Sequence, residues 1–98
     1  MGQLDNKVAI VTGAARGLGR AYAEALAAEG ARVLACDLND CADTVAAIDA
    51  AGGQAQSAIV DIADMASCQA MAEQAVAGLG RIDVLVNNAA LYGGLKGA

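Results

Sequence analysis

The sequence predicts an α/β fold, in which four parallel strands form one sheet in the order 3-2-1-4 and helices cover both faces. Three observations lead to this fold class. Four apolar runs are continuous instead of alternating, as in parallel strands that are buried on both sides. Alanine-rich segments with helical spacing separate these runs. The connections are short, so right-handed crossovers give a three-layer, doubly wound arrangement.

The first strand is predicted over residues 7–12, and a glycine-containing turn follows it. The first helix is predicted over residues 17–29. Its apolar stripe, which we expect to face the sheet, consists of Leu18, Tyr22, Ala25 and Leu26. Gly30 should end this helix, because glycine readily takes the left-handed conformation of a C-cap.

The second strand is predicted over residues 31–36 and runs directly into Asp37. The second helix follows over residues 40–51, with Val45 and Ile48 pointing inward. The second strand completes the first β-α-β unit, whose strands should be neighbours in the sheet, and the second helix begins the next unit.

The third strand is predicted over residues 54–60, and Asp61 follows its carboxyl end. The third helix is predicted over residues 64–78. Its inward side is expected to hold Met65, Cys68, Met71, Ala72, Ala75 and Leu79. The fourth strand is short and covers residues 84–86.

Residues 12–19 read Thr-Gly-Ala-Ala-Arg-Gly-Leu-Gly and join the first strand to the first helix. Gly13 can end the strand sharply, Gly17 lets the backbone approach a bound group, and Gly19 lets helix and strand pack closely. The first amides of the helix lack internal partners, and its dipole favours an anion. We therefore predict a pyrophosphate site. The alternative is a plain strand–helix turn, because glycines alone are a weak signal.

Each strand is followed by residues suited to a ligand, namely Gly13, Asp37, Asp61, Asn87 and Asn88. In the order 3-2-1-4 the winding reverses between the first and fourth strands, and ligands bind beyond the strands' carboxyl ends there. Asp37 lies 24 residues after Gly13, near the spacing of a ribose-binding carboxylate. Its alternative role is a helix N-cap or a solvated loop residue. The agreement of these placements predicts a Rossmann-type dinucleotide crevice.

Composition excludes several other classes of function. The net charge is −5 and no lysine or arginine cluster occurs, so we expect no nucleic-acid partner. Cys36, Cys41 and Cys68 lack a C-x-x-C spacing and the chain has no histidine, so no metal site is expected. Free thiols, together with the lack of a signal segment and of a long apolar run, predict a cytoplasmic protein without membrane contact.

With these elements in place, the chain resembles the N-terminal half of a short-chain dehydrogenase/reductase. Residues 12–19 match the family's TGxxxGxG motif, and residues 83–90 match its segment ending in NNAG. The resemblance covers nearly the whole chain. It implies that the cofactor-binding residues are Gly13, Arg16, Gly17, Leu18 and Gly19 at the pyrophosphate, Asp37 at the adenosine ribose, Asp61 and Ile62 at the adenine, and Asn88 and Ala89 near the nicotinamide ribose.

The same resemblance implies an NAD(P)-dependent oxidoreductase that acts on an alcohol or ketone. We predict NAD over NADP, because the Asp37 carboxylate would repel a 2′-phosphate, although Arg16 is common in relatives that use NADPH. Two positions depart from the family. Ala90 replaces a glycine. Ala63 replaces a hydroxyl residue, so Asp61 or Asp64 should cap the third helix.

The family's catalytic serine and Tyr-x-x-x-Lys pair are expected beyond Ala98. Tyr92 and Lys96 have the pair's spacing, but they follow Asn88 too closely, and we interpret them as a coincidence. Residues 1–98 are therefore expected to be the N-terminal part of one NAD(P)-binding domain, without catalytic competence alone. The intact protein should be a homo-oligomer. The alternative is a non-catalytic dinucleotide-binding module.

Overall fold

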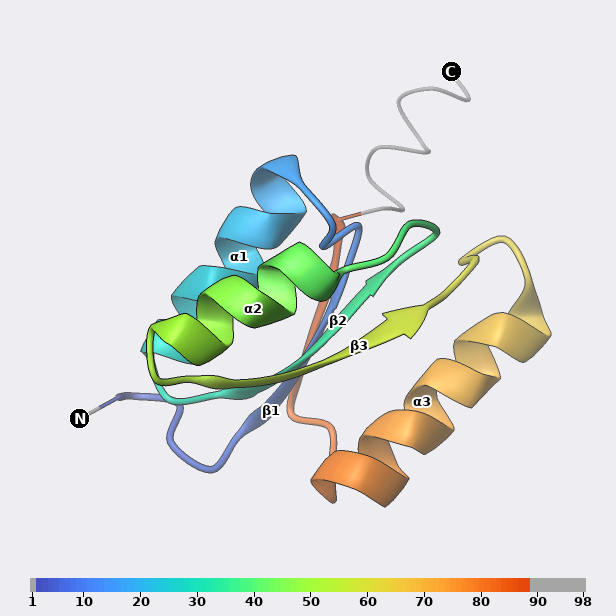
Figure 1. Cartoon of the computed structure of the whole chain (residues 1–98). Coiled ribbons are helices and arrows are strands. Elements are labelled where there is room, and N and C mark those ends of the chain that lie inside the picture. The colour runs from blue at the N-terminus through green and yellow to red at the C-terminus, as the bar shows by residue number, and fades with distance from the viewer. Residues whose placement is uncertain (1, 89–98) are drawn as a thin grey trace.

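The computed structural model describes residues 2–88 of the chain, and Figure 1 shows a sheet between two layers of helices. The strands are β1 (Val8–Thr12), β2 (Arg32–Asp37), β3 (Gln54–Ile59) and β4 (Val84–Asn87), and the helices are α1 (Gly17–Ala28), α2 (Ala42–Ala50) and α3 (Met65–Leu79). All strands pair in parallel, in the order β3-β2-β1-β4. The predicted fold class is therefore confirmed, with boundaries that agree to within two residues.

Two apolar cores lie on opposite faces of the sheet, because successive strand residues point to opposite sides. The α1/α2 core consists of Ala9, Val11, Ala14, Ala23, Ala27, Ala31, Val33, Ala35, Cys41 and Ile48. The α3 core consists of Val8, Ile10, Leu34, Cys36, Val60, Ala75 and Leu79. Every residue of β1 is buried, which explains why its apolar run is continuous.

The predicted inward stripe of α1 is wrong for Leu18, Tyr22 and Ala25. These side chains are exposed, and Leu26 is half-buried. The buried stripe is formed instead by Gly19, Ala23 and Ala27. Gly19 lies so close to the turn before α1 that a Cβ there would overlap the carbonyl oxygen of Gly13. Because the helix approaches the sheet this closely, only very small side chains fit beneath it.

The other two helices follow their predicted faces more closely. In α2, Ile48 is buried and Val45 packs against the α1/α2 core. In α3 the predicted face is confirmed except for Met65, the first residue of the helix, which is 84% exposed. The cap of α3 is Asp64, whose Oδ1 accepts a hydrogen bond of 3.0 Å from the Ala66 N–H.

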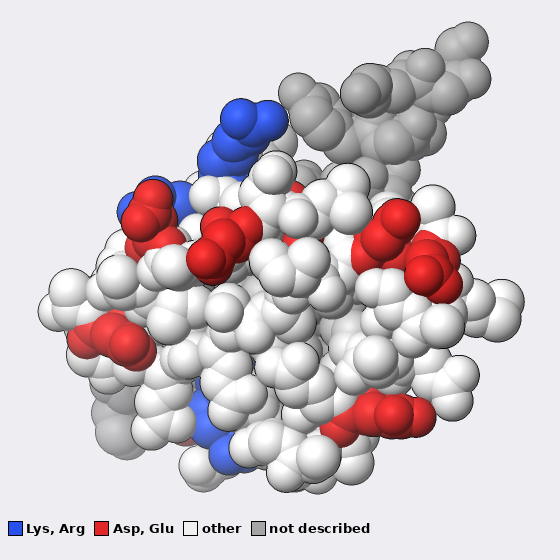
Figure 2. All heavy atoms as spheres, turned by 45° about the vertical axis from the view of Figure 1, so that its right-hand side comes forward, with Lys and Arg blue, Asp and Glu red and all other residues white. Residues whose placement is uncertain are grey.

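The surface agrees with the charge seen in the sequence. On the face turned forward in Figure 2, acidic side chains are dispersed and the few basic side chains lie near its edges. None of the helices within residues 2–88 is long and apolar enough to cross a membrane.

Candidate functional site

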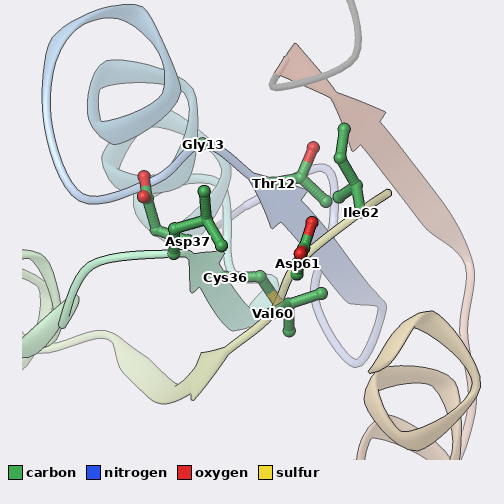
Figure 3. A pocket seen from close by; sticks show the side chains of 8 residues that line it. Thr12, Gly13, Cys36, Asp37, Val60, Asp61 and Ile62 are labelled. Carbon is green, nitrogen blue, oxygen red and sulfur yellow. The ribbon is translucent and has the colours of Figure 1, made fainter. Parts of the chain in front are cut away.

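A cavity of about 230 Å³ lies beyond the carboxyl ends of the central strands. Its lining residues are Thr12, Gly13, Cys36, Asp37, Leu38, Val60, Asp61 and Ile62. Figure 3 shows these side chains arriving from three places, namely the end of β1, the end of β2 and the segment after β3. The cavity therefore lies at the carboxyl ends of β1, β2 and β3, and it combines an apolar floor with two carboxylates. None of its described lining residues comes from β4, on the other side of the predicted reversal.

The glycine turn between β1 and α1 forms one wall of this site. Gly13 and Gly17 have φ values of 68° and 64°, in the left-handed region that favours glycine. Arg16 precedes α1 in an extended conformation, and its side chain does not cap the helix. The first turn of α1 also carries no acidic residue. The amides and the positive end of this helix dipole are therefore left available to an anionic group.

The starts of the other two helices differ from that of α1. Asp40 Oδ1 accepts a hydrogen bond of 2.9 Å from the Ala42 N–H at the start of α2, and Asp64 caps α3 in the same way. Within residues 2–88, only α1 begins without a side-chain acceptor for its first amides. This difference fits a helix whose capping group is a ligand.

Asp37 connects β2 to the glycine turn. Its Oδ2 accepts a hydrogen bond of 3.1 Å from the Ala15 N–H, and its Oδ1 accepts one of 3.0 Å from the Asn39 N–H. A carboxylate has about four acceptor positions, so Asp37 can still accept bonds from a diol. Its carboxylate is half-buried at the cavity, which reduces competition from water.

The end of β4 meets the same turn. Asn88 Nδ2 donates a hydrogen bond of 3.5 Å to the Gly13 carbonyl oxygen, beside the position where Gly19 packs. One residue earlier, the Thr12 hydroxyl donates to Asn87 Oδ1 at 3.0 Å. The asparagine pair and the glycine turn are therefore held together, as expected from their places at adjacent strand ends.

Cys36 forms part of the cavity floor, next to Val60 (Figure 3). Burial, followed by charge repulsion from the nearby Cys41 and Asp37, raises the pKa of this thiol to about 12. The group is therefore a neutral thiol at physiological pH, where it contributes apolar surface instead of a nucleophile.

The structure brings together four of the predicted cofactor-binding residues as cavity lining: Gly13, Asp37, Asp61 and Ile62. Arg16, Gly17 and Leu18 lie exposed at the start of α1, outside the cavity lining, and Gly19 is buried beneath the turn. Ala89, Ala90, Tyr92 and Lys96 fall outside the described residues. Within residues 2–88, no cluster of His, Cys, Asp or Glu could hold a metal ion.

Four lining residues were not identified from the sequence. Thr12 opens the glycine-turn motif, and Cys36 and Val60 end predicted strands, but none of the three is predicted to bind the cofactor, although each lies beside a predicted site residue. The fourth is Leu38, which is 65% exposed. The sequence signal that could have identified it is an apolar residue directly after Asp37.

Comparison with known proteins gives a consistent result. A family model described as short chain dehydrogenase matches residues 7–97. An uncharacterized oxidoreductase of Mycobacterium tuberculosis is 55% identical over 96 residues, which cover 94% of this chain and 38% of that protein. The galactitol 2-dehydrogenase of Agrobacterium fabrum is 43% identical over 90 residues, which cover 92% of this chain and 35% of that enzyme.

Solved structures agree with these sequence relatives. The crystal structure of hydroxysteroid dehydrogenase from Escherichia coli superposes with a TM-score of 0.84 and 40% sequence identity. The match covers 86% of this chain and 37% of that structure. The chain therefore spans little more than a third of the length of these curated relatives and solved structures.

Proposed function

Because this chain belongs to the short-chain dehydrogenase family, we propose that it forms the dinucleotide-binding half of a nicotinamide-dependent oxidoreductase. The whole protein would transfer a hydride between the nicotinamide ring and an alcohol or carbonyl substrate. The observation that carries this proposal is the half-buried Asp37 carboxylate, placed between the cavity and the glycine turn. One carboxylate there can serve a ribose while the adjacent turn serves the pyrophosphate.

The size of the cavity supports a partial site. About 230 Å³ is less than the roughly 300–1000 Å³ typical of a whole ligand pocket, so the cavity suits only the adenosine end of a dinucleotide. In this arrangement Asp61 and Ile62 border the adenine, and Asn88 and Ala89 lie toward the nicotinamide ribose. When bound, the nicotinamide supplies the hydride chemistry. The residues of this chain bind and orient the cofactor.

The charges around the cavity favour NAD over NADP. Asp37 and Asp61 both line it, and among the described residues its lining contains neither lysine nor arginine. A 2′-phosphate placed beside Asp37 would meet a like charge in a partly desolvated site. Arg16 is exposed at the start of α1 and can serve the pyrophosphate of either cofactor.

Substrate choice belongs to the rest of the protein in this proposal. Two of the relatives described above are dehydrogenases of galactitol and of a hydroxysteroid, which are chemically very different alcohols. Both resemble this chain to a similar degree, with 43% and 40% sequence identity. This supports an alcohol or ketone as the substrate class and a catalytic serine, tyrosine and lysine located beyond Ala98. We further propose a cytoplasmic homo-oligomer, in keeping with three free thiols and the family resemblance.

The experiment that tests this proposal is titration of the full chain, as its host makes it, with NADH and NADPH. Wild-type protein should bind NADH more tightly. Asp37→Ala should weaken NADH binding by about 1–3 kcal/mol, the value of charge-assisted hydrogen bonds, and should shift the preference toward NADPH. The matched control is Asp49→Ala, which removes the same charge from the exposed side of α2.

Three results would contradict the proposal in different ways. Tighter binding of NADPH by the wild-type protein would overturn the role of Asp37, while leaving an NADP-dependent enzyme possible. Binding of neither nucleotide would overturn the dinucleotide site. Binding without turnover of any alcohol or ketone would leave a non-catalytic dinucleotide-binding module.

A further inference from the structure

One peptide group of the glycine turn is held on both sides by side chains from other elements. The Ala14 carbonyl oxygen accepts a hydrogen bond of 2.7 Å from the Thr44 hydroxyl of α2. The Ala15 N–H, which belongs to the same peptide group, donates to Asp37 Oδ2 at 3.1 Å. Rotation of this peptide would therefore break both hydrogen bonds at once.

The contact made by Thr44 is fully enclosed. Thr44 and Ala14 are each 0% exposed, so water cannot replace the hydroxyl if it is removed. A buried carbonyl that loses its donor carries a desolvation cost. The Ala14 N–H is also bound, donating 2.9 Å to the Cys36 carbonyl oxygen at the end of β2. Both sides of Ala14 are thus tied to the elements that surround the cavity.

The held peptide lies directly before the backbone that should meet the anion. Arg16 is the extended residue that precedes α1, and Gly17 begins the helix in the left-handed conformation. The orientation of the Ala14–Ala15 peptide therefore sets the direction in which the next amides point. If these amides are already oriented toward the ligand before it binds, no free energy is needed to order them on binding.

We propose that Thr44 is a positioning residue of the dinucleotide site, which fixes the Ala14–Ala15 peptide together with Asp37 and so aims the pyrophosphate-binding amides. This inference rests on the proposed function. It also links the two parts of the site: the residue that binds the ribose and the turn that binds the pyrophosphate share one hydrogen-bonded peptide. Thr44 itself does not line the cavity and should not touch the cofactor.

The test compares three ligands on variants of the full chain. Thr44→Val removes the hydroxyl and keeps the shape of the side chain, whereas Thr44→Ser keeps the hydroxyl. The probes are NADH, ADP and adenosine. We expect Thr44→Val to weaken NADH and ADP by about tenfold while adenosine changes by less than about twofold, because adenosine lacks the pyrophosphate. Thr44→Ser should restore most of the affinity.

The matched control is Ile48→Val, which removes one buried methyl group from the same helix and no hydrogen bond to the turn. It should leave all three affinities unchanged. If Thr44→Val does not fold, the pair Thr44→Ser and Thr44→Ala makes the same comparison, since these variants differ by the hydroxyl alone. Hydrogen exchange of residues 12–19 without nucleotide should be faster in the variants that lack the hydroxyl.

The outcomes separate this inference from the proposed function. Wild-type protein that binds neither NADH nor ADP would overturn both. Wild-type protein that binds them while the variants lacking the hydroxyl bind equally well would overturn only the role of Thr44. Equal losses for adenosine and ADP would also overturn it, because they would indicate general destabilisation instead of a misaimed turn.

Discussion

The two faces of the sheet are packed in different ways, although alanine-rich helices cover both (Figure 1). On one face, the α1/α2 core is built mainly from alanine and valine, and Gly19 brings α1 against the turn that precedes it. On the other, the α3 core uses larger side chains such as Ile10, Leu34 and Leu79. Small side chains fix a short distance between layers, whereas larger ones fill a wider one.

The faces also differ in how completely the helices cover them. Val84 and Val86 of β4 are half-buried against the α1/α2 core. Leu85 points to the opposite face, since its partner Ile10 belongs to the α3 core, and it is 57% exposed. Within residues 2–88, α3 thus covers the β1–β3 side of this face, and no helix covers β4 there.

This difference shows where precision is needed in the molecule. The glycine turn, Asp37 and Thr44 all meet on the α1/α2 side, where hydrogen bonds of 2.7–3.1 Å depend on a fixed layer spacing. On the α3 face the packing is mainly burial of apolar side chains, of which Cys36 and Val60 also form part of the cavity floor. Substitutions should therefore have different consequences on the two faces.

The largest expected effect comes from adding one methyl group at Gly19. In Gly19→Ala the new Cβ would overlap the Gly13 carbonyl and approach Asn88 Nδ2 at 3.0 Å. Because the obstructing atom is backbone, α1 must move away from the turn. We expect a loss of about 3 kcal/mol in unfolding free energy, the upper end for overpacking, together with loss of NADH binding. Urea unfolding of the full chain measures the first effect.

The matched substitution on the other face is Gly78→Ala in α3. Here the new Cβ would lie 3.1 Å from Gln56 Oε1, the end of a flexible side chain that can turn aside. Alanine is the better helix former, so we expect stability to rise by up to about 1 kcal/mol. Similar losses of unfolding free energy in Gly19→Ala and Gly78→Ala would show that the two faces are equally tightly packed, and would contradict the difference described above.

The sequence was sufficient for the fold because the relevant signals are local. Continuous apolar runs indicated the strand order, which is confirmed. The glycine turn indicated a crevice at the carboxyl ends of the strands, and the structure has a cavity there on the β1–β3 side. The buried face of α1 was missed because helical periodicity favoured the larger side chains, Leu18 and Tyr22. The close approach at Gly19, which leaves them exposed, is a tertiary effect.

The candidate site was predictable in position but not in its connections. Asp37 was identified by its spacing from Gly13, whereas its hydrogen bond to Ala15 depends on the three-dimensional path of the turn. Thr44 lies 30 residues from Ala14, and no local pattern signals that bond. A threonine one helical turn before the buried Ile48 was the only available hint.

A further prediction concerns β4. Within residues 2–88 no helix covers this strand on the α3 face, and side-chain hydrogen bonds hold it near both ends. At its start, Asp83 Oδ2 accepts a bond of 2.9 Å from the Val8 N–H, and Arg81 pairs with Oδ1 at 2.7 Å. The hydrogen bond from Val8, followed by that from Arg81 and its charge, lowers the pKa of Asp83 below its ordinary value of 3.8.

The sign of the resulting pH dependence follows from this lowered pKa. The stabilisation by Asp83 is complete at pH values above 3.8 and is lost as the pH falls through the lower, folded-state pKa. Asp83→Asn should therefore be less stable than wild type at pH 7, and the difference should shrink as the pH falls through the lowered pKa of Asp83. Thermal unfolding between pH 2.5 and 7 measures it. A difference that persists at low pH, or an equal one in the exposed Asp49→Asn, would contradict this explanation.

The smallest expected effect is on thiol reactivity. The labelling rates of cysteines on the two faces compare how often each face opens, without a substitution in either core. Cys36 belongs to the α3 core and Cys41 to the α1/α2 core, and burial raises their pKa values to about 12 and about 11. At pH 8 neither thiol is ionised to a useful degree, so a disulfide reagent should label half-buried Cys68 first. Cys68→Ser should remove this fast phase.

The labelling rates of the two slow thiols, Cys36 and Cys41, then report how often each face opens. If Cys36 is labelled faster than Cys41 despite its higher pKa, the α3 face opens more often than the α1/α2 face, as its less complete helical cover implies. The reverse order would show that the α1/α2 face opens more often.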